Sequence, residues 1–87
     1  MPMRLVVVAP SGIICHTQIE MVTLPGEIGA FTVLSGHAPL ISHLTAGEIV
    51  YTEKENENRL AIKNGFVRVD RDMVEVCVEL PDETKKG

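Results

Sequence analysis

The sequence lacks the features on which several classes of protein depend. It has no stretch of positive charge: eight Lys and Arg against twelve Asp and Glu leave a net charge of −4. A nucleic-acid binder normally neutralises phosphates with a basic stripe, so we expect no nucleic-acid partner. The longest apolar run, residues 5–10, is far shorter than the roughly 20 residues of a membrane span. The N-terminus also shows no signal-peptide cleavage pattern. We therefore expect a soluble, cytosolic chain with no segment inserted into a membrane.

Cysteine and histidine are few and scattered. Cys15 and Cys77 could form one disulfide, but two reduced thiols are the expectation for a chain without a signal peptide. His16, His37 and His43 form no cluster with them at the short spacings of metal ligands, so we expect no metal and no cofactor. A catalytic Cys–His pair stays open as an alternative, although no local signature supports it.

What the sequence does have is alternation of apolar and polar residues with a period of two. In residues 73–80 the residues Val74, Val76, Val78 and Leu80 share one face, and Glu75, Cys77 and Glu79 share the other. Residues 66–70 alternate in the same way. The segments 4–8 and 19–24 are rich in Val, Ile and Leu, which is typical of strands buried on both faces.

Turn signals separate these runs at short intervals. Asn64-Gly65 predicts a tight hairpin between residues 60–62 and 66–69, because both residue types tolerate positive φ. The charged segment 53–58 predicts a solvated hairpin end. Pro81 and the acids after it could begin a helix. The pattern predicts an all-β fold, a two-sheet β-sandwich or flattened barrel of about ten short strands. We expect residues 1–80 to form this domain and residues 81–87 a short polar tail.

Glycine and proline are concentrated in residues 24–49, where four of the seven glycines lie. Such a segment fixes several turns and often forms a binding surface. Its centre reads Phe31-Thr32-Val33-Leu34-Ser35-Gly36-His37-Ala38-Pro39-Leu40. This segment, with its flanking strands, resembles the signature of the N-terminal domain of the epsilon subunit of F-type ATP synthases. The resemblance covers roughly residues 3–80.

The resemblance implies a β-sandwich and a non-catalytic role in the central stalk of a proton-translocating ATP synthase. The subunit would link the gamma subunit to the membrane c ring, as a peripheral protein on the cytoplasmic face of the inner membrane and a monomer when isolated. By position, Ala9, His37 and Ser42 would lie toward gamma, and Glu27 and Ala30 toward the c ring. His37 could equally well hold its own turn by bonding a backbone carbonyl.

Several departures from the family pattern affect what can be carried over. Thr32 and Ser35 stand where relatives usually have glycine and proline, and Cys15 takes a position that is often aromatic. The chain ends before the helical hairpin with which relatives usually continue, so we expect neither autoinhibition nor a nucleotide site. The alternatives are a free-standing β-sandwich binding module and a small hydrolase that uses Cys15 or Cys77.

Overall fold

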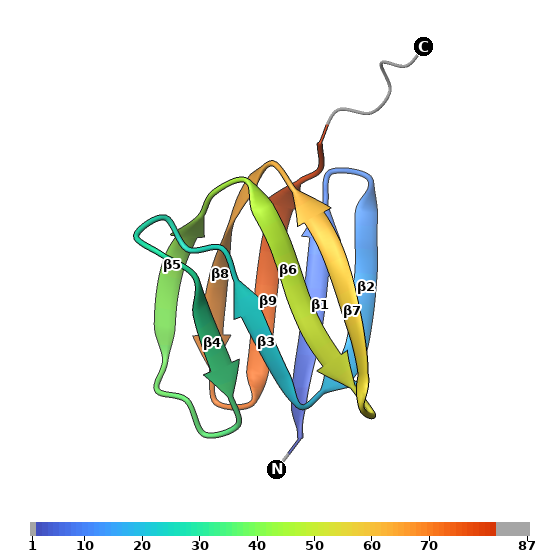
Figure 1. Ribbon diagram of the computed structural model, residues 1–87, viewed down its shortest axis with the longest axis vertical. Coiled ribbons are helices and arrows are strands. Elements are labelled where there is room, and N and C mark those ends of the chain that lie inside the picture. The colour runs from blue at the N-terminus through green and yellow to red at the C-terminus, as the bar shows by residue number, and fades with distance from the viewer. Residues whose placement is uncertain (1, 82–87) are drawn as a thin grey trace.

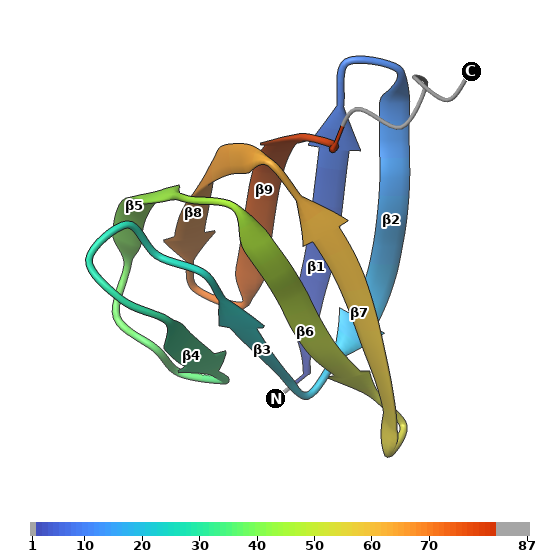
Figure 2. The same cartoon turned by 45° about the horizontal axis from the view of Figure 1, so that its top comes forward.

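Nine strands make up two sheets that pack face to face in the computed structural model, which describes residues 2–81 (Figures 1 and 2). The strands are β1 (Met3–Ala9), β2 (Gly12–Ile19), β3 (Met21–Leu24), β4 (Phe31–Leu34), β5 (Leu40–Leu44), β6 (Gly47–Glu53), β7 (Asn56–Ile62), β8 (Asn64–Asp70) and β9 (Met73–Glu79). One sheet has the order β2-β1-β9-β8-β5 and the other β4-β3-β6-β7. The expected two-sheet sandwich is confirmed, with nine strands where the sequence suggested about ten. Residues 82–87, where a helix could begin and where the short polar tail is expected, lie outside the described residues.

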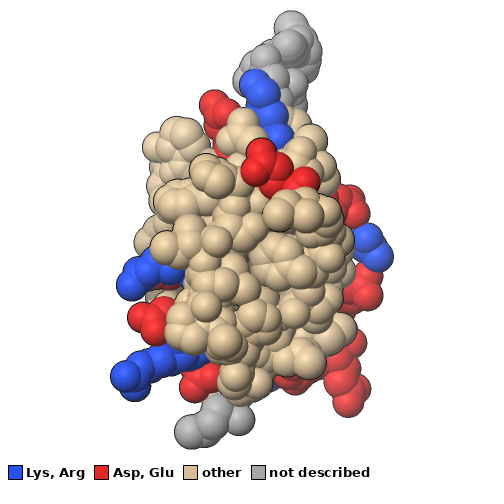
Figure 3. All heavy atoms as spheres, turned by 90° about the vertical axis from the view of Figure 1, so that its left-hand side faces the viewer, with Lys and Arg blue, Asp and Glu red and all other residues tan. Residues whose placement is uncertain are grey.

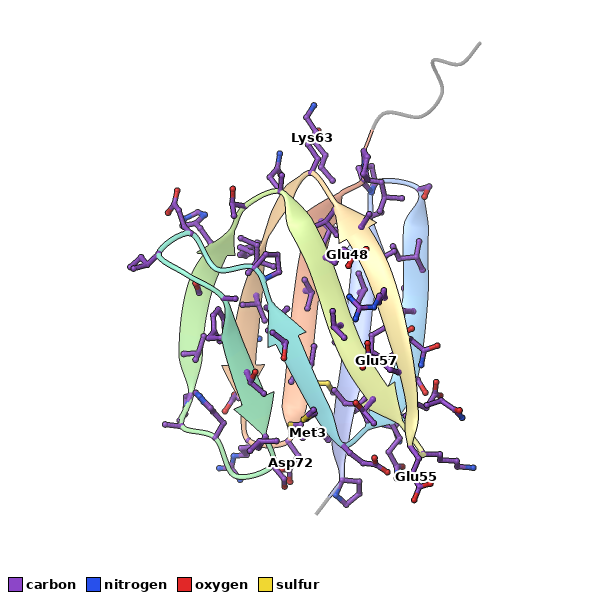
Figure 4. All side chains as sticks on the ribbon, in the orientation of Figure 1. Met3, Glu48, Glu55, Glu57, Lys63 and Asp72 are labelled. Carbon is purple, nitrogen blue, oxygen red and sulfur yellow. The ribbon has the colours of Figure 1, made fainter. Side chains whose placement is uncertain are left out.

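The core consists of one face of each sheet. Sixteen hydrophobic side chains are buried, and no polar or charged side chain among the described residues is buried with them. Met3, Leu5 and Val7 of β1 are buried and point between the sheets, and Figure 4 labels Met3 near the lower end of the sandwich. The predicted inward face of β9 is confirmed, since Val74, Val76 and Val78 are buried and Glu75 and Cys77 are exposed. Burial of these β-branched residues against each other gives a closely packed interior.

The two segments expected to be buried on both faces are not. In β1 only alternate residues are buried, while Arg4 is exposed and Val6 and Val8 are half-buried. Residues 19–24 are not one strand, because the chain passes from one sheet to the other at Glu20, whose N–H donates to the Thr52 carbonyl at 2.9 Å. The abundance of Val and Ile therefore predicted strands correctly here, but it did not show whether one or both faces of each strand are buried.

The hairpin predicted at Asn64-Gly65 is also wrong. The strands before and after it, β7 and β8, belong to different sheets and do not pair. Neither residue has positive φ. Gly65 serves another purpose: a Cβ atom there would lie 2.3 Å from the Cys77 carbonyl oxygen of β9. The glycine allows two strand backbones to approach closely at the corner between the sheets.

Other turns are found where they were expected. Residues 54 and 55 have positive φ and join β6 to β7, which confirms the charged hairpin end. Arg71, with φ of 58°, turns β8 into β9. The two strands farthest apart in sequence, β1 and β9, pair in parallel in the middle of the five-stranded sheet.

Candidate partner-binding surface

One side of the sandwich, between the edges of β4 and β5, carries a shallow uncharged hollow. Its lining residues come from the loop after β3, from β4 and from β5: Gly26, Ile28, Gly29, Ala30, Phe31, His37, Leu40, Ile41 and Ser42. None of these is Lys, Arg, Asp or Glu. Figure 3 faces this side and shows a broad area without such residues, with the charged side chains lying mostly around its rim. We call this surface the side hollow.

The glycine-rich loop of residues 25–30 is held against β5 by backbone hydrogen bonds. Glu27 N–H donates to the His43 carbonyl at 3.0 Å, and Thr45 N–H donates to the Pro25 carbonyl at 2.9 Å. Gly26 is required for this folding of the loop, because a Cβ atom there would lie 2.6 Å from the Gly29 carbonyl oxygen. The local sequence thus produces a fixed loop at one end of the side hollow.

The structure brings together two of the three residues expected to lie toward gamma. His37 and Ser42 both line the side hollow. The His37 Nδ1 lies 2.7 Å from the Ala38 carbonyl oxygen, so the ring bonds the backbone of its own turn as well as facing the hollow. Ser42 is half-buried on the inner side of β5 and donates to the His43 carbonyl at 3.1 Å.

Ala9 lies elsewhere. It is buried at the end of β1, with 5% of its surface exposed. Two strands, β9 and β8, separate β1 from β5. Ala9 and Ser42 are therefore three strand spacings apart, a total of roughly 14 Å across the sheet. The isolated domain does not present the Ala9 side chain to a partner.

The two residues expected to lie toward the c ring are both exposed on the loop of residues 25–30. Ala30 lines the side hollow, and Glu27 lies in the chain between two other lining residues of the hollow, Gly26 and Ile28. Sequence reasoning missed the most exposed apolar residue of this loop, Ile28, whose side chain is fully exposed. The signal was present, since a branched apolar residue stands between two glycines in a turn.

Sequence reasoning also missed an apolar row on the outer face of the five-stranded sheet. Strand register places Ile13, Val8, Cys77 and Phe66 side by side across β2, β1, β9 and β8. Ile13 is 65% exposed and Phe66 is 43% exposed. Ile41 of β5 is 72% exposed on the same face and also lines the side hollow. Register pairs Phe66 with His43 and Ile41 with Arg68, so Ile41 lies beside a charged residue and diagonal to the end of the row.

The cysteines are free and lie on opposite faces of one sheet. Cys15 of β2 points between the sheets, and Cys77 of β9 points outward, so the two cannot bridge in this fold. Cys77 and His43 are both on the outer face, but Phe66 of β8 lies between them. Two strand spacings, about 10 Å in total, therefore separate Cys77 from His43. That separation is too large for a nucleophile and its base.

The Cys15 Sγ and the Tyr51 hydroxyl oxygen lie 3.5 Å apart, within hydrogen-bond distance for sulfur. The hydrogen bond with Cys15, burial and the negative charge near the hydroxyl, including that of Glu53, raise the pKa of Tyr51 to about 12. Thr17 donates to Glu53 nearby. These side-chain bonds connect the two sheets along the side opposite the hollow, so the pair of Cys15 and Tyr51 has a structural role in the packing.

Within residues 2–81 no group of three His, Cys, Asp or Glu side chains is arranged to hold a metal ion. The same residues contain no helix of the length and apolarity needed to cross a membrane.

The architecture and the uncharged hollow define a small β-sandwich whose surfaces suit binding to other proteins. Residues 2–80 match the family described as the beta-sandwich domain of the ATP synthase delta/epsilon chain. The chain belongs to this family. It is 41% identical over 76 residues to the ATP synthase epsilon chain of Aliarcobacter butzleri and 40% identical over 78 residues to that of a Sulfurovum species.

The matches cover 87% and 88% of this chain and 61% of each relative, so the chain spans about three fifths of their length. Among solved structures, one chain of the mitochondrial ATP synthase of Euglena gracilis, in an OSCP/F1/c-ring structure, aligns with a TM-score of 0.83 at 19% identity, over 88% of this chain and 50% of that one. A chain of the Tetrahymena thermophila central stalk and c ring aligns with a TM-score of 0.76 at 14% identity, over 100% and 76%. These two likenesses show the same fold.

Proposed function

We propose that this chain is a non-catalytic rotor subunit of an F-type ATP synthase, which joins the gamma subunit to the membrane c ring and couples proton flow to ATP synthesis. The observation that carries the proposal is the family match over residues 2–80, together with the uncharged side hollow. The likeness to chains of stalk and c-ring assemblies supports it. The subunit would lie at the cytoplasmic face of the inner membrane as a peripheral part of the complex.

The gamma subunit would bind the β5 side of the side hollow. His37 and Ser42 lie there, and the Ile41 side chain beside them is 72% exposed. Ala9 is buried, so it would act on gamma binding only indirectly, through its half-buried neighbour Val8. Contact areas that are apolar at the centre and charged at the rim are typical of stable protein interfaces.

The c ring would be met by the loop of residues 25–30. Ile28 and Ala30 offer apolar contact, and Glu27 offers a carboxylate that can fix the orientation against a basic group. The loop is suited to carry load because backbone hydrogen bonds hold it to β5. No cofactor is needed for this role.

The test is reconstitution with the 87-residue chain. We expect it to co-purify with the gamma subunit and to restore proton-coupled ATP synthesis when added to an ATP synthase stripped of its own epsilon subunit. We also propose that the 87-residue chain does so without inhibiting ATP hydrolysis by the detached F1 sector, because the resemblance implies inhibition through a helical hairpin, whereas residues 2–80 match the beta-sandwich domain.

Two exposed substitutions separate the two contacts. Ile41→Arg should weaken gamma binding. Glu27→Lys changes a loop residue that does not line the side hollow, and it should leave gamma binding intact but reduce the restored coupling. Both side chains are exposed, so the fold should be unaffected. A chain that binds neither partner would instead favour the free-standing binding module.

A further inference from the structure

The four sheet edges of the sandwich are protected to different degrees. Two of the edges lie on the side opposite the hollow. The pairing of β2 with β1 contains a β-bulge, where the register shifts between Val7 and Val8 of β1, and β7 carries the charged residues Glu57 and Arg59. Both are devices that discourage pairing with another chain. On the hollow side, β4 and β5 have neither a bulge nor a charged residue.

The backbone of β5 has hydrogen-bonding groups on its outer edge. The His43 carbonyl accepts from Glu27 N–H, so the backbone groups of His43 point away from β8. Residues two apart in a strand point the same way, so the N–H and C=O of Ile41 also point to this edge. The loop of residues 25–30 covers the edge at His43 and Thr45 but does not extend to Ile41. Within residues 2–81, Ile41 has no backbone partner on that side.

The side hollow lies beside this unpaired edge. A strand added along Ile41 would direct alternate side chains toward Phe31 and Leu40 and the others toward the outer face. Such side chains should be uncharged, because the lining offers no charged partner and burial of an unpaired charge is costly. A helix would not satisfy the Ile41 backbone, because its own N–H and C=O groups are bonded internally.

We propose that the β5 edge at Ile41 is a strand-addition site, at which an extended, uncharged segment of the gamma subunit adds a sixth strand to the five-stranded sheet. This inference rests on the proposed function, since it names the way in which the same surface would bind its partner. Main-chain hydrogen bonds would supply affinity, and the hollow would select the side chains.

The direct test is amide hydrogen exchange, measured by NMR on the isotope-labelled 87-residue chain with and without purified gamma subunit. The Ile41 N–H points to the open edge and should exchange fast in the free chain and at least about tenfold more slowly in the complex. The Ser42 amide, which faces β8, should be slow in both states and serves as the internal control.

A pair of variants at one position separates backbone from side chain. Ile41→Pro removes the N–H donor at an edge position where proline is tolerated, and it should weaken gamma binding about tenfold, the equivalent of one hydrogen bond. Ile41→Val keeps the N–H and most of the side chain, and it should bind within about twofold of the parent. Should Ile41→Pro fail to fold, the exchange measurement on the parent chain decides.

Three results would overturn the inference. If gamma binds and the exchange of Ile41 is unchanged, the strand-addition site is wrong while the proposed function stands. If gamma does not bind at all, both proposals fail. If Ile41 becomes protected as the concentration of the chain alone rises, the edge pairs with a second copy and not with gamma.

Discussion

At the scale of single residues, the Tyr51 hydroxyl is the group whose titration the fold changes most clearly. It is half-buried between the sheets and bonded to Cys15, and its pKa is raised to about 12 from 10.0. The neutral phenol is therefore favoured in the folded state. Its contribution to stability is complete below pH 10, where both states are protonated, and is lost as the pH rises from 10 to 12.

The raised pKa of Tyr51 can be measured directly by ultraviolet absorbance, since Tyr51 is the only tyrosine in the sequence and tryptophan is absent. Ultraviolet titration of the phenol should give a midpoint near 12 in the folded chain, and Cys15→Ala should move it toward 10, because the hydrogen bond is the largest cause of the shift. The loss of stability above pH 10 should be smaller in Tyr51→Phe. A midpoint unchanged by Cys15→Ala would mean that burial is the main cause.

Gly65 supports a second prediction at this scale. Gly65→Ala places a methyl group against the Cys77 carbonyl oxygen and beside the Val78 Cα. Because backbone cannot move away as a flexible side chain can, we expect a loss of roughly 1–3 kcal/mol in unfolding free energy, measured by denaturant titration. The neighbouring Asn64→Ala removes only an exposed hydrogen bond to Glu79 and should cost less than about 1 kcal/mol. Equal losses from both changes would contradict the close approach.

At the scale of elements, β9 is the central strand to test, because it pairs with β1 on one side and β8 on the other. Val76→Asp puts a carboxylate without a partner into the core, at a cost of several kcal/mol against a total stability of roughly 5–15, and the domain should unfold. Circular dichroism would report the loss of folded structure.

The adjacent substitution on the other face is the control. Glu75→Lys removes an exposed ion pair with Arg68, whose nitrogen lies 2.9 Å from the Glu75 carboxylate. Exposed pairs contribute about 0–1 kcal/mol, so the thermal midpoint should shift little. If Glu75→Lys unfolded the chain and Val76→Asp did not, the assigned faces of β9 would be reversed.

The faces of strands could be predicted from the sequence, and the connections between strands could not. Alternation in residues 73–79 determined which side of β9 is buried, because an inward residue must be apolar wherever one face is covered. Asn64-Gly65 has the composition of a hairpin, yet the glycine is needed for contact with β9, which lies farther along the chain. The side hollow escaped prediction for the same reason: His37, Ser42 and Ala30 meet only because the loop of residues 25–30 folds back on β5.

At the scale of the whole molecule, the exposed apolar residues are divided among several regions. The outer row, the side hollow and the pair of Met21 and Leu34 on the four-stranded sheet face different directions. Charged side chains lie between and around them, and Figure 4 shows Lys63 at one end of the sandwich and Glu55 and Asp72 at the other. A partner can therefore be bound on one side while the opposite side remains solvated.

We expect the isolated chain to be a monomer at micromolar concentration, because no single apolar region spans a whole face and the net charge of −4 opposes association. Sedimentation should give a mass near 9.5 kDa. A dimer that persists at high dilution would contradict this expectation.

The parallel pairing of β1 with β9 has a consequence for biosynthesis. A ribosome delivers β1 first, yet its neighbour in the middle of the sheet, residues 73–79, emerges last. The seven residues of β1 therefore lack this neighbour, and Leu5 and Val7 stay partly uncovered, until residues 73–79 have left the exit tunnel. Folding of the sandwich is expected only after that point, in a slow step dominated by distant contacts. During that interval the uncovered apolar residues are expected to make the nascent chain prone to aggregation.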